Sequence, residues 1–205
     1  MTGIDVSSNN GIIDWASVKS NPMFNVDFAI IKSDEGVGYN DPQRALNSQN
    51  AKHNNIKIGY YHFASLNSLD VVKDATEEAN YFMKSMSILP KADLPPVLDI
   101  ETNKKGLTKN EVLSWINAFI KTIQKSYPMI VLYSYAPFLN ENLPPNHNLG
   151  NIPLWIAQYP TNYRPDLNPK LPNGWNDYWM WQYSSKGKVN GIKTNVDLNI
   201  MKTSL

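Results

Sequence analysis

The chain of 205 residues contains no cysteine, which excludes disulfides, thiol nucleophiles and cysteine-based zinc sites. It has no apolar run near the ~18–20 residues that a membrane-spanning helix needs, so we expect no membrane partner. Neither sign of charge is in excess, because 19 Lys and Arg stand against 18 Asp and Glu. A net charge of +1 provides no long-range field for nucleic acid, so we expect no nucleic-acid partner.

Signals for export and for internal boundaries are also missing. The start, Met1-Thr2-Gly3-Ile4-Asp5, has no basic region followed by an apolar one, so we expect no signal peptide in this chain. No repeat, charge block or flexible linker divides the sequence. With 42% hydrophobic and 18% charged residues, it predicts one globular domain over residues 1–205 that acts as a monomer.

Eight short runs of apolar, β-branched or aromatic residues are each bounded by turn residues, which is typical of buried strands. Eight is the number of strands that closes a parallel barrel. The runs are Gly3–Ser7, Phe28–Lys32, Ile58–Ala64, Val97–Glu101, Ile130–Tyr135, Leu154–Tyr159, Tyr178–Tyr183 and Val196–Ile200.

Helical patterns fill several of the earlier gaps. Asp41-Pro42 predicts a helix start, with the helix running to about Asn54, and Asp70 predicts another. Thr108–Glu111 has the spacing of a capping box before an amphipathic run. A short helix is expected over Asp14–Ser20.

The later gaps show no helical period. Four prolines interrupt residues 159–177, and residues 184–194 suit a hairpin-like connection. The sequence therefore predicts an α/β barrel with about eight strands and fewer than eight helices, in which loops join the last strands.

Polar residues gather at the ends of the expected strands. In a parallel barrel the C-terminal ends of the strands share one face, where active sites form. The candidates in chain order are Asp5, Lys32, Asp34, Glu35, Tyr60, His62, Asp99, Glu101, Tyr133, Tyr135, Trp155, Gln158, Trp181, Gln182 and Asp197.

Asp99 and Glu101 give the sharpest signal. Residues i and i+2 of a strand point to the same side, about 6.5 Å apart along the backbone. Two carboxylates that close repel, so one of them tends to keep a proton near neutral pH. Glycoside cleavage needs such a pair, an acid for the leaving oxygen and an anion facing the positive charge on the sugar. Asp-x-Glu alone is common at solvated strand ends, but Asp5 and Asp197 add two further acids to the same face.

A metal site is the competing explanation of clustered acids. His62 is the one histidine inside a strand pattern, and a lone histidine is more often a core residue than a ligand. Oxygen-only sites for Mg²⁺ or Ca²⁺ stay open on this reasoning. We predict no metal and no cofactor.

Aromatic residues are abundant, with 6 Trp, 11 Tyr and 6 Phe. Sugars present flat C–H faces that suit aromatic walls carrying a few polar groups. We therefore expect substrate contacts from strand-end side chains, namely Glu35, Tyr60, His62, Tyr133, Trp155, Gln158 and Gln182.

In this setting the sequence resembles glycoside hydrolase family 25, the Chalaropsis-type lysozymes. The matching segments run almost end to end. They include Gly3-Ile4-Asp5-Val6-Ser7, Phe28-Ala29-Ile30-Ile31-Lys32, Glu35-Gly36, Gly59-Tyr60-Tyr61-His62-Phe63, Pro95-Pro96-Val97-Leu98-Asp99-Ile100-Glu101, Pro153-Leu154-Trp155-Ile156-Ala157-Gln158-Tyr159, Trp181-Gln182-Tyr183 and Val196-Asp197-Leu198-Asn199. Two stretches depart from the family pattern, Asn9-Asn10-Gly11 and Ser33-Asp34.

The resemblance implies a flattened, irregular TIM-like barrel and hydrolysis of the β-1,4 bond between N-acetylmuramic acid and N-acetylglucosamine. It implies Glu101 as general acid/base, Asp99 as its partner carboxylate, and Asp5 and Asp197 as further active-site acids. The partner would be peptidoglycan at the bacterial cell wall. Many relatives carry wall-binding repeats, and this sequence shows none.

Two other functions stay open, a chitinase-type glycosidase and an inactive peptidoglycan-binding module. The presence of both Asp99 and Glu101 favours an enzyme. Their position on one strand places Asp99 beside Glu101, which suits substrate assistance by the sugar's acetamido group better than direct attack by Asp99.

Overall fold

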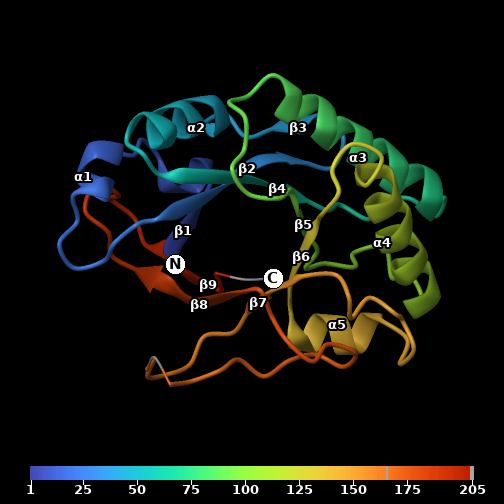
Figure 1. The fold of residues 1–205 in the computed structure, drawn as a ribbon. Coiled ribbons are helices and arrows are strands. Elements are labelled where there is room, and N and C mark those ends of the chain that lie inside the picture. Colours follow the sequence, from blue (N-terminus) through green and yellow to red (C-terminus); the bar gives the residue numbers. More distant parts are fainter. Residues whose placement is uncertain (165, 204–205) are drawn as a thin grey trace.

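The strands of the computed structural model, which describes residues 1–164 and 166–203, form one sheet that closes into a barrel (Figure 1). All eight expected strands are present, and a two-residue strand, β3, joins them. The strands are β1 (Thr2–Val6), β2 (Phe28–Glu35), β3 (Tyr39–Asn40), β4 (Lys57–Phe63), β5 (Val97–Asp99), β6 (Val131–Tyr135), β7 (Leu154–Ala157), β8 (Met180–Gly187) and β9 (Val196–Met201).

The barrel is mixed rather than all parallel. Neighbouring strands are parallel from β1 through β2, β4, β5, β6 and β7 to β8. The last strand, β9, is antiparallel to both β8 and β1 and closes the ring between them. A hairpin replaces the final β/α unit because residues 188–195 are too few to carry a crossover helix.

The helices are α1 (Trp15–Lys19), α2 (Arg44–His53), α3 (Val71–Ser87), α4 (Lys109–Ile123) and α5 (Ala136–Asn142), with a 3₁₀ turn, η1 (Ser8–Asn10), after β1. Asp70 caps α3 as predicted, since its side chain accepts a hydrogen bond from the Lys73 amide. The capping box of α4 also forms. Helix α2 begins later than predicted because residues 41–43 form a turn before it. In this turn the Asp41 carboxylate accepts from the Gln43 amide, and it also accepts from the distant Ser8 amide.

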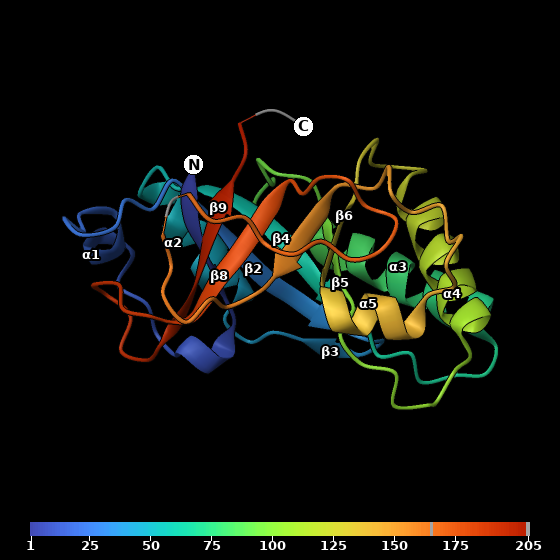
Figure 2. The same ribbon diagram turned by 90° about the horizontal axis from the view of Figure 1, so that it is seen from below.

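Helices cover only part of the barrel. In Figure 1, α2, α3 and α4 form an arc outside β2, β4, β5 and β6. On the other side, extended coil crosses the outer side of β8 and β9 (Figure 2). Tyr163 from this coil stacks on Tyr183 at 4.1 Å between ring centroids. Coil thus covers the outer surface of β8. The prediction that loops rather than helices join the last strands is confirmed for the described residues.

Alternation along the strands divides the core into two layers. Phe28, Ile30 and Val97 belong to a cluster inside the barrel, whereas Ala29 and Ile31 pack outside against the helices. Gly3 makes room for the interior, since a Cβ there would lie 2.5 Å from the Phe28 oxygen. The inner cluster fills the lower barrel, so inward-facing positions further along the strands surround the mouth.

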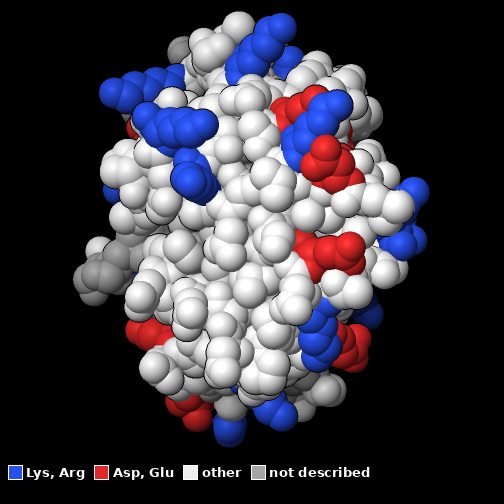
Figure 3. Space-filling view, turned by 90° about the vertical axis from the view of Figure 1, so that its right-hand side faces the viewer, with Lys and Arg blue, Asp and Glu red and all other residues white. Residues whose placement is uncertain are grey.

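The surface carries no dominant charge on the face shown in Figure 3. Acidic and basic residues surround a largely uncharged middle there. Among residues 1–164 and 166–203, none of the helices has the length and apolar character needed to cross a bilayer.

The capping box of α4 provides a test of the local fold. Thr108 Oγ1 accepts from the Glu111 amide at 3.4 Å, and the Glu111 carboxylate accepts from the Thr108 amide at 2.7 Å. Thr108→Ala should lower the free energy of unfolding by about 1 kcal/mol in urea titrations, because the cap is lost. Thr108→Ser retains the oxygen and should stay near wild type. Equal stability of Thr108→Ala and wild type would contradict the capping role.

Candidate active site

A cavity of about 270 Å³ lies at the barrel mouth, and four carboxyl groups line it. Asp5 is contributed by β1 and Asp99 by β5, while Glu101 follows β5 and Asp197 lies near the start of β9. Because β9 is antiparallel, the start of this strand, rather than its end, reaches the mouth. The structure therefore brings all four predicted acids together. Asp197 lies near the start of an antiparallel strand, whereas it was expected at the C-terminal end of a parallel one.

Asp5 and Asp197 form the first pair of acids. They lie directly opposite each other across β1 and β9. Burial, and then the charge of Asp197, raises the pKa of Asp5 well above its ordinary value. Burial raises the pKa of Asp197 to about 6. Two facing carboxyl groups of this kind do not both ionise readily, so the pair retains a proton into the mildly acidic range.

Asp99 and Glu101 form the second pair. Burial raises the pKa of Asp99 well above its ordinary value, and the charge of Glu101 raises it further. Burial also raises the pKa of Glu101, while the hydrogen bond from Asp99 and the charge of Lys32 oppose the rise. The hydrogen bond between the two groups raises the pKa of Asp99 and lowers that of Glu101, so it favours the proton on Asp99. Asp99 Oδ1 is buried and has no hydrogen-bond partner within the described parts of the chain.

Gln182 orients one of these acids. Its Nε2 donates to Asp5 Oδ2 at 2.9 Å, and its Oε1 accepts from the hydroxyls of Tyr133 and Tyr159 at 2.8 and 2.6 Å. Asn199 Nδ2 donates to the same Asp5 oxygen at 2.7 Å. These neutral donors compensate for the burial of Asp5 and fix its carboxyl group in the cavity wall.

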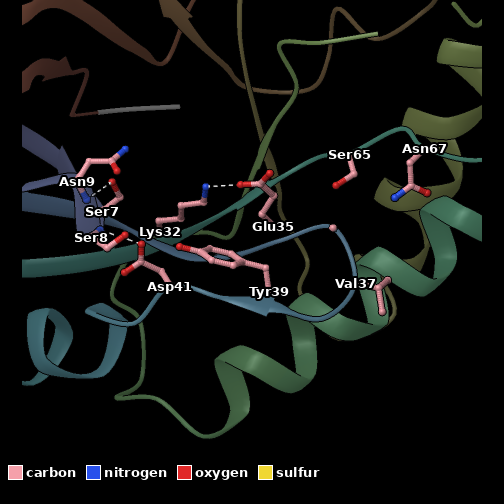
Figure 4. Close-up of a pocket in the computed structure, with 11 residues that line it drawn as sticks. Ser7, Ser8, Asn9, Lys32, Glu35, Val37, Tyr39, Asp41, Ser65 and Asn67 are labelled. Carbon is pink, nitrogen blue, oxygen red and sulfur yellow. Dashed lines mark hydrogen bonds and ion pairs between the residues drawn. The ribbon is translucent and has the colours of Figure 1, made fainter. Parts of the chain in front are cut away.

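Several pockets share lining residues with the central cavity, and two of them extend it into a groove. The aromatic pocket, of about 540 Å³, shares Glu101, Tyr133 and Tyr159 with the central cavity. It also contains the predicted contact Gln158, whose Oε1 accepts from the Lys170 amide at 2.5 Å. The polar pocket, of about 450 Å³, lies on the other side (Figure 4). It shares Ser7, Asn9 and Lys32 with the central cavity and adds Glu35, Tyr39 and Asn67.

Five predicted substrate contacts line this groove. Tyr133, Trp155 and Gln182 surround the central cavity, where the rings of Tyr133 and Trp155 lie 4.5 Å apart. Gln158 and Glu35 lie in the pockets on either side. A groove with a polar centre and pockets on both sides suits a linear polymer cut at an internal bond.

Two predicted contacts are wrong, because they lie on outward-facing positions of β4. Tyr60 is 1% exposed and donates its hydroxyl to the Pro90 oxygen at 2.7 Å, away from the mouth. His62 is fully buried between Asp34 and Glu78, which lie 2.5 and 2.8 Å from its ring nitrogens. Asp34, a predicted strand-end group, is therefore also outside the groove.

Sequence reasoning named Lys32 only as a strand-end candidate without a role, and it did not assign Tyr61, Phe63 or Tyr159, although all four line the central cavity. Tyr61 and Phe63 occupy the inward positions of β4 on either side of His62. Lys32 follows the inward residues Phe28 and Ile30 at the spacing of two. The alternation was thus a signal for all three. Tyr159 lies beyond the end of β7, where strand alternation gives no guide.

Metal binding was the alternative explanation of these acids. No group of three or more His, Asp or Glu side chains is arranged to hold a metal ion in residues 1–164 and 166–203. Both nitrogens of His62 are occupied by carboxylates, so this ring is not available as a ligand from the mouth.

Known proteins are similar to this chain in sequence and in fold. Residues 4–192 match the family model described as glycosyl hydrolases family 25. The chain is 34% identical to "Lysozyme M1" of Streptomyces globisporus over 96% of its length, and 31% identical to the "Autolytic lysozyme" of Clostridium acetobutylicum over 97%. It spans 66% and 55% of the lengths of these two relatives.

Solved structures agree with the sequence matches. The bacterial lysozyme from Streptomyces coelicolor superposes with a TM-score of 0.84 at 32% identity, covering 100% of this chain and 93% of that one. A muramidase from Acremonium alcalophilum gives a TM-score of 0.80 at 26% identity, covering 100% of this chain and 94% of that one. The chain therefore belongs to glycosyl hydrolase family 25.

Proposed function

We propose that this protein is a peptidoglycan hydrolase that acts on the bacterial cell wall. It cleaves the β-1,4 bond between N-acetylmuramic acid and N-acetylglucosamine with retention of configuration. The observation that carries the proposal is the Asp99–Glu101 pair on one strand end, in the middle of a groove that can hold a sugar chain on both sides. The names of the lysozyme relatives support the choice of substrate.

Glu101 acts as the general acid and then as the general base. It lines both the central cavity and the aromatic pocket, so it stands where a leaving sugar would depart. Its raised pKa suits an acid that must keep its proton in the mildly acidic range until the glycosidic oxygen accepts it. The tyrosines of the aromatic pocket provide flat surfaces for the departing sugar.

Asp99 acts through the substrate's acetamido group. Asp99 lines the central cavity, and its buried Oδ1 has no donor within the described residues, so a small rotation of this side chain would let the unpaired oxygen accept from a ligand N–H. That hydrogen bond favours the Asp99 anion and thereby shifts the shared proton to Glu101, where catalysis needs it. The amide oxygen of the same group then attacks the anomeric carbon while the glycosidic C–O bond breaks and the leaving oxygen takes the proton of Glu101. Water then attacks the same carbon, the bond to the amide oxygen breaks, and Glu101 takes the proton of the water.

Removing the acid provides the first test of the proposal. Glu101→Gln should lower wall hydrolysis by about 10²–10⁴-fold or more, because Gln keeps the shape but cannot donate and recover a proton. Release of new reducing ends from bacterial walls is measured, and the reducing-end sugar is identified as N-acetylmuramic acid. Glu77→Gln on the exposed side of α3 is the matched control and should retain full activity. Near-native lysis by Glu101→Gln would rule out the assigned role.

The role of the acetamido group is tested on the substrate. Strands whose muramic acid carries a free amine in place of the acetamido group should be cleaved very poorly, since the internal nucleophile is missing. Matched strands that are deacetylated only on glucosamine serve as the control. Mass spectrometry of the enzyme trapped during turnover could contradict this role. A sugar ester on Asp99 would establish direct attack by this carboxylate.

The acid cluster should reduce the stability of the fold, which is expected of groups retained for function. The pKa of Asp197 is raised to about 6, so its proton stabilises the folded state below pH 4 and this contribution is lost as the pH rises through 6. Asp197→Asn should therefore raise the free energy of unfolding by up to roughly 2–3 kcal/mol at pH 8 and little at pH 4. Wall hydrolysis should fall in the same variant.

Denaturant titrations at the two pH values measure this difference. Asp166→Asn, which removes an exposed carboxylate, is the control and should show no such pH dependence. An Asp197→Asn variant whose stability follows wild type at both pH values would show that the pair is not under electrostatic strain.

A further inference from the structure

The polar pocket has no part in the bond cleavage proposed above, yet it adjoins the central cavity and contains a fixed cation. Lys32 lines both cavities. Its Nζ donates to Glu35 Oε2 at 2.7 Å and lies 5.5 Å from the ring centre of Tyr39 (Figure 4). The same atom lies 5.0 Å from the ring centre of Phe63. The carboxylate and the two rings hold the ammonium group at the junction of the cavities.

The ammonium group still has hydrogen-bonding capacity. It carries three N–H groups, and Glu35 is the one residue in the described parts of the chain that accepts from it. The Lys32 side chain is only 15% exposed, which makes each unused donor costly unless a ligand pairs with it. Lys32 thus presents donors for an oxygen ligand at the inner edge of the polar pocket.

The position of Glu101 orients the sugar chain relative to this cation. Glu101 lines the central cavity and the aromatic pocket but is not among the residues of the polar pocket. The leaving oxygen therefore lies toward the aromatic pocket. The ring that is cut lies in the central cavity, with its anomeric carbon toward Glu101. The opposite half of that ring, which carries O3 and O4, lies toward Lys32.

We propose that the polar pocket binds the 3-O-lactyl group of the N-acetylmuramic acid residue whose bond is cut, with Lys32 donating to the lactyl carboxyl oxygen. This inference rests on the proposed function. The lactyl ether on O3 is the group that distinguishes this sugar from N-acetylglucosamine, so Lys32 is the residue that selects between them. Asn9, Ser65 and Asn67 offer both donors and acceptors, which suits the amide chain that continues from the lactyl group in the wall.

Binding measured without turnover tests the proposal. In a Glu101→Gln background, dissociation constants are determined by calorimetry for two tetrasaccharides of equal length. One alternates N-acetylglucosamine with N-acetylmuramic acid bearing a free lactyl carboxylate, and the other contains N-acetylglucosamine alone. Adding Lys32→Met should weaken the first by roughly ten- to hundredfold, the range for a hydrogen bond to a charged group. Binding of the second should change by less than about twofold on the same reasoning.

Two further variants complete the experiment. Lys170→Met removes the lysine of the aromatic pocket, and it should leave the ratio of the two dissociation constants unchanged. Asn67→Trp fills the polar pocket from an exposed position, and it should weaken binding of the lactyl-bearing ligand selectively even if Lys32→Met does not fold. Equal weakening of both ligands, or of neither, in the folded Lys32 and Asn67 variants would overturn the proposal.

Hydrolysis of walls by the enzyme with Glu101 intact distinguishes failure of the lactyl site from failure of the proposed function. Wall hydrolysis combined with a binding ratio that does not depend on Lys32 overturns the lactyl site alone. Absence of wall hydrolysis overturns the proposed function itself.

Discussion

The antiparallel pairing of β9 with β1 is the interaction on which the site depends. It closes the barrel with a strand that enters from the mouth, so Asp197 lies opposite Asp5 instead of at the far end of its strand. The same pairing places Asn199 beside Asp5, to which its amide donates. A parallel final strand would have required a crossover helix and would have carried Asp197 and Asn199 to other heights in the barrel. The strand pairing that closes the barrel therefore also brings the acid cluster together.

That closure gathers four carboxyl groups around a small cavity, which is unfavourable unless their charge is managed. The protein does this with protons and neutral donors more than with cations. Gln182 and Asn199 donate to Asp5, whereas Asp99 keeps an oxygen without any donor in the described residues. The contrast is informative, because buried acceptors are normally satisfied. Two side chains of the protein hold Asp5 in place, whereas Asp99 Oδ1 has no such donor in the described residues, which is what the proposed role of Asp99 requires.

Sequence patterns predicted the strands well because each run is short, apolar and bounded by turn residues. The capped helices α3 and α4 were predicted for an equally local reason, since Asp70 and Thr108 satisfy the first amides of their own helices. Helix α5 has no side-chain cap and follows β6 directly, so Pro137 in its first turn was the one local signal for it, and the helix was not predicted from it. The prediction of Tyr60 and His62 as substrate contacts was wrong because it used their place in a strand but not the alternation of side chains between the two faces of that strand. Tyr61 and Phe63 occupy the inward positions of β4, so the neighbouring Tyr60 and His62 face outward.

The two faces of β4 show why the outward residues matter to the groove all the same. A bulge between Lys32 and Asp34 in β2 turns Asp34 outward to His62 and returns Glu35 to the polar pocket. Burial disfavours a charged His62, but its hydrogen bonds to Asp34 and Glu78 outweigh that effect and raise the pKa of the ring. The ring joins two buried carboxyl groups, those of Asp34 and Glu78, behind the sheet. These bonds lie beside the bulge after which Glu35 returns to the polar pocket, so His62 supports the wall of the groove without reaching the mouth.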